Sequence, residues 1–92
     1  MIRNFKHKGL ERFFKTGSKR SIDAAHAPRM QRILDRLDTV QFPDDMNVPG
    51  FGFHRLTGNR KGEYSVSVSG NWRITFRFDN GEAYDVNLED YH

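Results

Sequence analysis

The sequence predicts a two-layer α+β fold, in which two N-terminal helices pack on a mainly antiparallel β-sheet. Two observations carry this prediction. Apolar residues recur at helical spacing in the first half of the chain, whereas apolar and polar residues alternate after Gly62. The length of 92 residues supports one domain, 1–92, and the absence of cysteine excludes disulfides and a cysteine-based zinc site.

The first half predicts a short strand or lead-in over 1–5 and then two helices. The first helix is expected over 7–16, ended by Gly17. The second is the clearer one, because a single apolar stripe faces a core: Met30, Ile33, Leu34, Leu37 and Val40. Pro28 is expected in its first two turns, and the helix must end before Pro43.

The second half predicts strands. An irregular crossing over 41–52 leads to a strand around 51–56, and a three-stranded antiparallel meander follows. Asn80-Gly81 is typical of a type I′ hairpin turn. The apolar face, expected to pack on both helices, comprises Tyr64, Val66, Val68, Trp72, Ile74, Phe76, Phe78, Tyr84, Val86 and Leu88. The polar face comprises Ser65, Ser67, Arg73, Thr75, Arg77, Asp85 and Asn87.

The charge distribution indicates either a polyanionic partner or simply a solvated basic surface. The net charge is +3, and basic residues crowd the first twenty positions with only Glu11 against them. A second basic group comprises His54, Arg55, Arg60, Lys61, Arg73 and Arg77. No apolar run approaches the ~18 residues of a membrane span. Charges also interrupt the N-terminus where a signal peptide is apolar, so a cytoplasmic protein without membrane contact is expected.

The polar sheet face is the candidate functional surface. Arg73 and Arg77 stand on it either to pair with Asp85 across strands or to grip phosphate with paired N–H donors. His54 is either a partly buried edge histidine or meets Arg73 and His92 on the same edge. Both alternatives stay open from the residues alone.

The chain ends in an acid, a phenol and an imidazole: Asp90, Tyr91 and His92. RNA cleavage needs a base for the ribose 2′-OH, an acid for the leaving 5′-oxygen and positive charge at the phosphate. Because the 2′-OH is the nucleophile, neither a metal nor a cofactor is required. A metal site built from His54, Asp90 and His92 with His7 or His26 has no helical ligand spacing to support it.

Three segments resemble the HigB toxins of the RelE superfamily: the opening Met1–Leu10, the strand Gly70-Asn71-Trp72-Arg73-Ile74-Thr75-Phe76, and the ending Glu89-Asp90-Tyr91-His92. The resemblance implies a RelE-like fold and a type II toxin that inhibits translation by cleaving mRNA in the ribosomal A site. It also implies a HigA-like antitoxin with a helix-turn-helix domain. The catalytic set that it implies is His54, Arg73, Asp90, Tyr91 and His92.

The chain departs from some of these relatives at Thr57, where they carry a lysine, so either Arg60 or Lys61 supplies that charge or the phosphate is stabilised less strongly here. In the expected mechanism Arg73, helped by Arg55 or Lys61, neutralises the phosphate. The general base is His92, and the general acid is His54 or Tyr91, with Asp90 as the orienting carboxylate. The residues expected to bind RNA or phosphate are Arg55, Arg60, Lys61 and Arg77.

Two other classes fit the same fold prediction. One is a non-catalytic gyrase inhibitor of the ParE kind, which resembles these toxins without the histidine set. The other is an RNA- or ribosome-binding module that uses the basic face without chemistry. His54 and the Asp90-Tyr91-His92 ending favour the enzyme.

Overall fold

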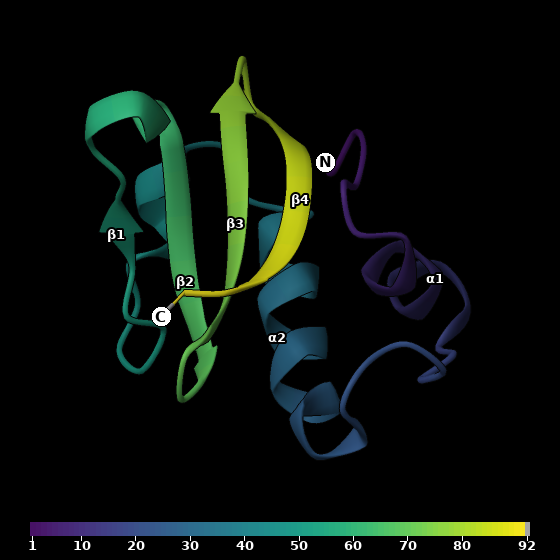
Figure 1. Cartoon of the computed structure of the whole chain (residues 1–92). Coiled ribbons are helices and arrows are strands. Elements are labelled where there is room, and N and C mark those ends of the chain that lie inside the picture. Colours follow the sequence, from purple (N-terminus) through teal and green to yellow (C-terminus); the bar gives the residue numbers. More distant parts are fainter. Residues whose placement is uncertain (92) are drawn as a thin grey trace.

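The computed structural model describes residues 1–91. Its helices are α1 (Lys8–Thr16), the 3-10 turn η1 (Ala24–His26), α2 (Ala27–Leu37), and the 3-10 turns η2 (Pro43–Met46) and η3 (Gly58–Arg60). Its strands are β1 (His54–Arg55), β2 (Glu63–Ser69), β3 (Trp72–Asp79) and β4 (Glu82–Asp90). The strands form one antiparallel sheet in the order β1-β2-β3-β4 (Figure 1). Within the described residues, no helix is long and apolar enough to cross a membrane.

The two expected α-helices are present, and η1 adds a further helical turn before the second of them. The His7 imidazole accepts a hydrogen bond from the backbone N–H of Leu10 and so caps α1 at its N-terminus. Gly17 ends α1 in the left-handed region at φ 78°, where its N–H donates to the Phe13 carbonyl. Both boundaries follow from local side-chain and backbone chemistry, which explains why the sequence pattern located them.

Helix α2 crosses one face of the sheet and supplies much of the core (Figure 1). Pro28 lies in its first turn, where the missing N–H removes no helical hydrogen bond. The predicted stripe is buried: Met30, Ile33, Leu34, Leu37 and Val40. Fully burying such a side chain contributes about 1.5–3 kcal/mol, so this stripe is a main source of the fold's stability.

Helix α1 lies beside the β4 edge of the sheet, and not over the same face as α2 (Figure 1). The lead-in to α1 runs parallel to β4, through bridges that join Ile2 to Ala83 and Phe5 to Val86. Leu10 and Phe13 of α1 still reach the common core. The prediction that both helices pack on the apolar face therefore holds for α2, whereas α1 extends the core sideways past β4.

A bulge in β4 makes one part of the predicted apolar face wrong. Thr75 lies opposite Asn87 but Arg77 lies opposite Tyr84, so β4 holds one extra residue at this point. Asp85 adopts φ 53° here. Beyond the bulge the alternation is reversed: Tyr84 shares the polar face with Arg77, and Ala83 takes the buried position. Trp72 keeps the helix side of the sheet but is 41% exposed and lies outside the buried core.

The crossing before β2 covers one end of the polar sheet face. The expected strand around 51–56 is reduced to His54–Arg55, because Gly52 turns the chain at φ 57°. The backbone passes so close to the sheet here that a Cβ at Gly52 would lie 2.8 Å from Ser67 Oγ. Ser65 and Thr75 are consequently almost fully buried although they belong to the polar face. After this close crossing His54 lies on the edge strand β1, opposite Ser65 of β2.

Candidate active site

A cleft of about 280 Å³ lies on the polar face of the sheet. This sheet-face cleft is lined by His54, Arg55, Leu56, Thr57, Ser65, Ser67, Arg73 and Tyr91. The chain after β4 turns across β3 toward β2 and so brings Tyr91 to the cleft (Figure 1). Three residues of the predicted catalytic set, His54, Arg73 and Tyr91, therefore share one concave surface although they come from three separate segments.

Arg73 is the most constrained cation of the cleft. On β3 it lies between Ser67 of β2 and Glu89 of β4, and its side chain is only 16% exposed. Its guanidinium carbon lies 4.4 Å from the centroid of the Tyr91 ring, a cation–π contact. Nη2 lies 3.4 Å from Glu89 Oε1, and the buried Nε has no hydrogen-bond partner among the described residues. The Arg73 guanidinium is thus already oriented by Tyr91 and Glu89, and its Nε has no hydrogen-bond partner among residues 1–91.

Glu89 links the charged groups behind Arg73. Its carboxylate accepts hydrogen bonds from Arg60 Nη1 and Nη2 at 2.8 and 2.6 Å, and from Thr75 Oγ1 at 2.8 Å. The hydrogen bonds from Arg60 are the main reason that the pKa of Glu89 falls to about 2, and burial opposes them. Sequence reasoning did not select Glu89 as a site residue. The sequence feature that could have identified Glu89 is its position in the alternation of β4, which places it opposite Arg73 of β3.

Arg60 has a different environment from the one expected of a phosphate-binding residue. Besides Glu89 it binds Glu63, with Nη2 2.7 Å and Nε 3.2 Å from the two carboxylate oxygens. These hydrogen bonds lower the pKa of Glu63 and raise that of Arg60. Nε, Nη1 and Nη2 of Arg60 all donate to carboxylates of the protein itself, so these donors are already occupied.

The other predicted cations surround the cleft more loosely. Arg77 is half exposed, with ion pairs to Asp85 at 3.8 Å and Glu63 at 3.6 Å, so the cross-strand pairing with Asp85 is present. Arg55 is exposed, binds the Asp44 carboxylate and lies over the Phe53 ring. Lys61 is exposed at the end of η3 and is not among the residues that line the cleft.

The end of the chain is held by the sheet as far as Tyr91. Asp90 is the last residue of β4 and lies opposite Trp72. The Tyr91 backbone N–H donates to the Asn71 carbonyl at 3.0 Å. His92 lies outside the described residues. Thr57, at the position where some relatives carry a lysine, lines the cleft and brings no charge to it.

The geometry gives no support to a metal centre. Among residues 1–91, no group of three or more histidine, cysteine, aspartate or glutamate side chains is arranged to hold an ion. Of the other histidines considered as ligands, His7 caps α1 and His26 lies 4.0 Å from the Asp23 carboxylate. What the sheet-face cleft offers is a fixed guanidinium, an imidazole and a phenol.

The chain is a RelE-like toxin of a type II toxin–antitoxin system. The family described as RelE-like toxin of type II toxin-antitoxin system HigB matches residues 3–92. The chain belongs to this HigB-like toxin family, and membership in a type II toxin–antitoxin system implies an antitoxin partner.

Relatives and solved structures agree with this placement. The chain is 42% identical over 92 residues, the full length of both, to Endoribonuclease HigB of Proteus vulgaris. It is 33% identical over 91 residues, 97% of this chain and 96% of the relative, to Toxin HigB-1 of Vibrio cholerae serotype O1. The fold is shared with crystal structures of Escherichia coli YafQ (TM-score 0.53, 16% identity) and of a histidine-to-glutamine mutant of YafQ (TM-score 0.51, 18% identity). Each alignment covers 96% of this chain and 92% of the YafQ chain.

Proposed function

We propose that this protein is an endoribonuclease that cleaves mRNA in the A site of the translating ribosome and thereby inhibits translation. The observation that carries the proposal is the meeting of His54, Arg73 and Tyr91 in one cleft. The relative from Proteus vulgaris, identical at 42% of positions, is named an endoribonuclease and supports the same reaction class. The whole chain acts as one domain in the cytoplasm, where ribosomes and mRNA are available.

The proposed reaction is an internal displacement at phosphorus. The ribose 2′-oxygen loses its proton to a general base and bonds to the phosphorus, while the bond to the 5′-oxygen breaks and that oxygen takes a proton from a general acid. The products are a 2′,3′-cyclic phosphate and a 5′-hydroxyl. His92 serves as base and His54 or Tyr91 as acid, with Asp90 as the orienting carboxylate. No metal takes part, because the substrate supplies its own nucleophile.

The electrostatics of the cleft support Arg73 as the group that neutralises the phosphate. Its buried Nε has no hydrogen-bond partner among residues 1–91, and its guanidinium is already oriented by Tyr91 and Glu89. Arg60 is paired with Glu63 and Glu89, which argues against it as the substitute for the lysine missing at Thr57. We assign the supporting charge to Lys61 and Arg55, and we assign Arg77 to the flanking RNA.

The antitoxin is proposed to be a HigA-like protein with a helix-turn-helix domain. This assignment extends the family membership, since a type II system pairs its toxin with a protein antitoxin. The toxin is proposed to need no cofactor, and neutralisation by a protein antitoxin does not require one either.

Primer-extension mapping of a model mRNA after brief induction tests the nuclease assignment. For the wild type we expect cuts inside the reading frame, and for His92→Ala a loss of at least about 100-fold, because a positioned acid or base contributes about 10²–10⁴-fold. Undiminished cutting by His92→Ala would refute the assignment of His92. Growth arrest with intact mRNA in both strains would refute the nuclease and favour a gyrase-inhibiting or ribosome-binding toxin.

A purified translation system separates ribosome-dependent from free cleavage. The proposal predicts rapid cutting of an mRNA held with its codon in the A site and little cutting of the same naked RNA. Equal rates on both substrates would contradict the A-site assignment and leave the nuclease assignment standing.

A further inference from the structure

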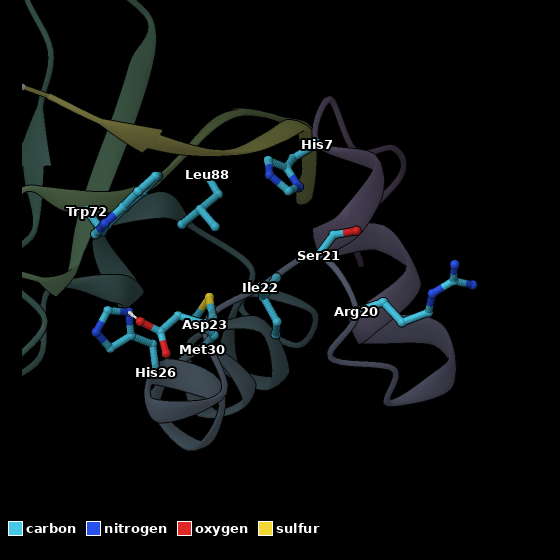
Figure 2. A pocket seen from close by; sticks show the side chains of 9 residues that line it. All are labelled: His7, Arg20, Ser21, Ile22, Asp23, His26, Met30, Trp72 and Leu88. Atoms are coloured by element: carbon cyan, nitrogen blue, oxygen red, sulfur yellow. Dashed lines mark ion pairs between the residues drawn. The ribbon is translucent and has the colours of Figure 1, made fainter.

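A second hollow lies on the opposite side of the sheet from the sheet-face cleft. This helix-side cavity has a volume of about 280 Å³ and lies between the start of α1, the loop before η1, the start of α2 and the ends of β3 and β4. Its walls include His7, Ile22, His26, Met30, Trp72 and Leu88 (Figure 2). None of the residues assigned to catalysis or RNA binding lines it.

One side of the helix-side cavity is apolar, and polar side chains line the rest of it. Trp72, the one tryptophan of the chain, is 41% exposed at its edge, and Met30 is fully buried behind it. Leu88 and Ile22 complete the apolar surface between Trp72 and His7 (Figure 2). A half-exposed tryptophan beside a hollow is typical of the central contact in protein–protein interfaces, where Trp, Tyr and Arg carry most of the binding energy.

The N-terminal segment that supplies His7, Arg20 and Asp23 to the helix-side cavity is basic. Residues 1–26 contain seven lysine and arginine residues, all exposed: Arg3, Lys6, Lys8, Arg12, Lys15, Lys19 and Arg20. Only two acidic residues accompany them, and both have basic partners: Glu11 lies 3.0 Å from Lys15 and Asp23 lies 4.0 Å from His26. The complementary occupant is an acidic segment that carries an apolar side chain.

RNA is a poorer match for the helix-side cavity than protein. A phosphate site needs guanidinium or ammonium groups that converge on one point. The Arg20 side chain instead points away from the cavity, and the Asp23 carboxylate forms part of its wall (Figure 2). Ile22, Met30, Trp72 and Leu88 give the hollow an apolar side, which suits the anchoring side chain of a protein partner.

We propose that the helix-side cavity is a docking site for the antitoxin. An apolar or aromatic side chain of the antitoxin enters the cavity against Trp72, and acidic residues beside it face Lys19 and Arg20. The inference rests on the part of the proposed function that gives the chain an antitoxin partner. It is independent of RNA cleavage, because it concerns binding alone.

Trp72 gives a direct readout of this site. Full-length protein labelled with 5-fluorotryptophan has a single fluorine resonance, because the chain contains one tryptophan. We expect this resonance to shift when one equivalent of purified cognate antitoxin is added. An unshifted resonance at saturation, with binding verified by calorimetry, would overturn the proposal. So would a shift caused by an RNA oligonucleotide in the absence of antitoxin, since the site would then belong to nucleic acid.

Substitutions with matched controls measure the contribution of the site. Trp72→Ala should weaken antitoxin binding by at least about 30-fold, the effect of losing a central interface residue. Phe42→Ala removes another exposed aromatic ring, 67% exposed and outside the cavity, and should change the Kd by less than about threefold. Equal effects of the two substitutions would contradict the proposal. Because the fluorine measurement uses the unsubstituted sequence, it decides the question even if Trp72→Ala fails to fold.

Charge reversal tests the acidic character of the partner. Lys19→Glu, next to the lining residue Arg20, should weaken binding and flatten its dependence on salt, because the proposed ion pair with the antitoxin is replaced by repulsion. Arg32→Glu makes the same change on the exposed side of α2, outside the residues that line the cavity, and should have little effect. Tighter binding by Lys19→Glu would show that the partner's facing segment is basic and would refute the proposal.

Discussion

The Arg60 guanidinium donates two hydrogen bonds to the Glu89 carboxylate, from Nη1 and Nη2 at 2.8 and 2.6 Å. The same carboxylate lies 3.4 Å from Nη2 of Arg73. Glu89 therefore holds two arginines at once, of which Arg60 is fully engaged within the protein and Arg73 faces the cleft. The pairing with Arg60 offsets part of the negative charge that Glu89 would otherwise direct at Arg73.

Glu89 should make stability depend on pH. Its pKa is lowered from 4.5 to about 2 in the folded protein, so its contribution to the free energy of unfolding is complete above pH 4.5 and is lost as the pH falls toward 2. The shift corresponds to at most about 3 kcal/mol. Urea unfolding should show Glu89→Gln to be markedly less stable than the wild type at pH 7, with the difference shrinking by pH 3. Glu82→Gln, on the same strand but paired with the exposed Arg3, should show little difference at either pH. A pH-independent deficit in Glu89→Gln would contradict this account.

Arg73→Lys should lower the rate of cleavage by about 10²-fold or more while the protein stays folded. Lysine keeps the charge but loses the planar guanidinium that stacks on Tyr91 and donates from several nitrogens. Single-turnover cleavage on programmed ribosomes, with circular dichroism as the folding test, measures both effects. The matched control is Arg12→Lys on the exposed surface of α1, for which we expect an unchanged rate. A normal rate for Arg73→Lys would mean that charge alone is sufficient.

Substitutions of Tyr91 can separate the contribution of its aromatic ring to cleavage from that of its hydroxyl group. Because the ring lies 4.4 Å from the Arg73 guanidinium carbon, Tyr91→Ala should slow cleavage more than Tyr91→Phe, by roughly 2- to 30-fold for the lost cation–π contact. The single-turnover assay compares the two variants directly. Equal losses in both would assign the role to the hydroxyl and would favour Tyr91 over His54 as the general acid.

Gly52→Ala should destabilise the fold and displace β1 with His54. An alanine at this position would be strained by the left-handed backbone at φ 57° and by a contact of 2.8 Å between its Cβ and Ser67 Oγ. Gly50→Ala is the control, since φ is 89° there but nothing lies within 4 Å of the added carbon. We expect a larger fall in cleavage for Gly52→Ala than for Gly50→Ala, with partial recovery when Ser67→Ala is added. Equal activity in the two single variants would argue against a role for this close crossing.

Local patterns in the sequence predicted the helices and the hairpins well. The cap of α1, the apolar stripe of α2 and the Asn80-Gly81 turn each depend on neighbouring residues alone. The bulge at Asp85 does not, because Asn4 stabilises it from the other end of the chain. Asn4 Nδ2 donates to Asp85 Oδ1 at 2.9 Å, and the Asp85 N–H donates back to Asn4 Oδ1 at 3.1 Å. Simple alternation therefore assigned Tyr84 to the wrong face.

Three of the five predicted catalytic residues share the sheet-face cleft, and their catalytic roles stay a prediction, whereas the charge balance around them was not foreseen. His54, Arg73 and Tyr91 stood out because their chemistry suits RNA cleavage, and the fold brings them together. Glu63 is a local partner of Arg60, three residues away, but Glu89 lies on β4 and meets Arg60 only after the sheet has formed, so the full engagement of Arg60 was not predictable. A basic residue near an active site can pair with the protein's own carboxylates and not with the substrate. Only the three-dimensional structure shows which of the two it does.

The bonds between Asn4 and Asp85 join residues 81 positions apart. Closing so long a loop costs conformational entropy before any contact compensates it, and contacts of high sequence separation slow folding. The strand that carries Glu89 and leads to Tyr91 is the same one that must dock against the first residues of the chain. The sheet-face cleft is therefore complete only when β4 has docked against the lead-in to α1, so its assembly depends on contacts between distant segments of the chain.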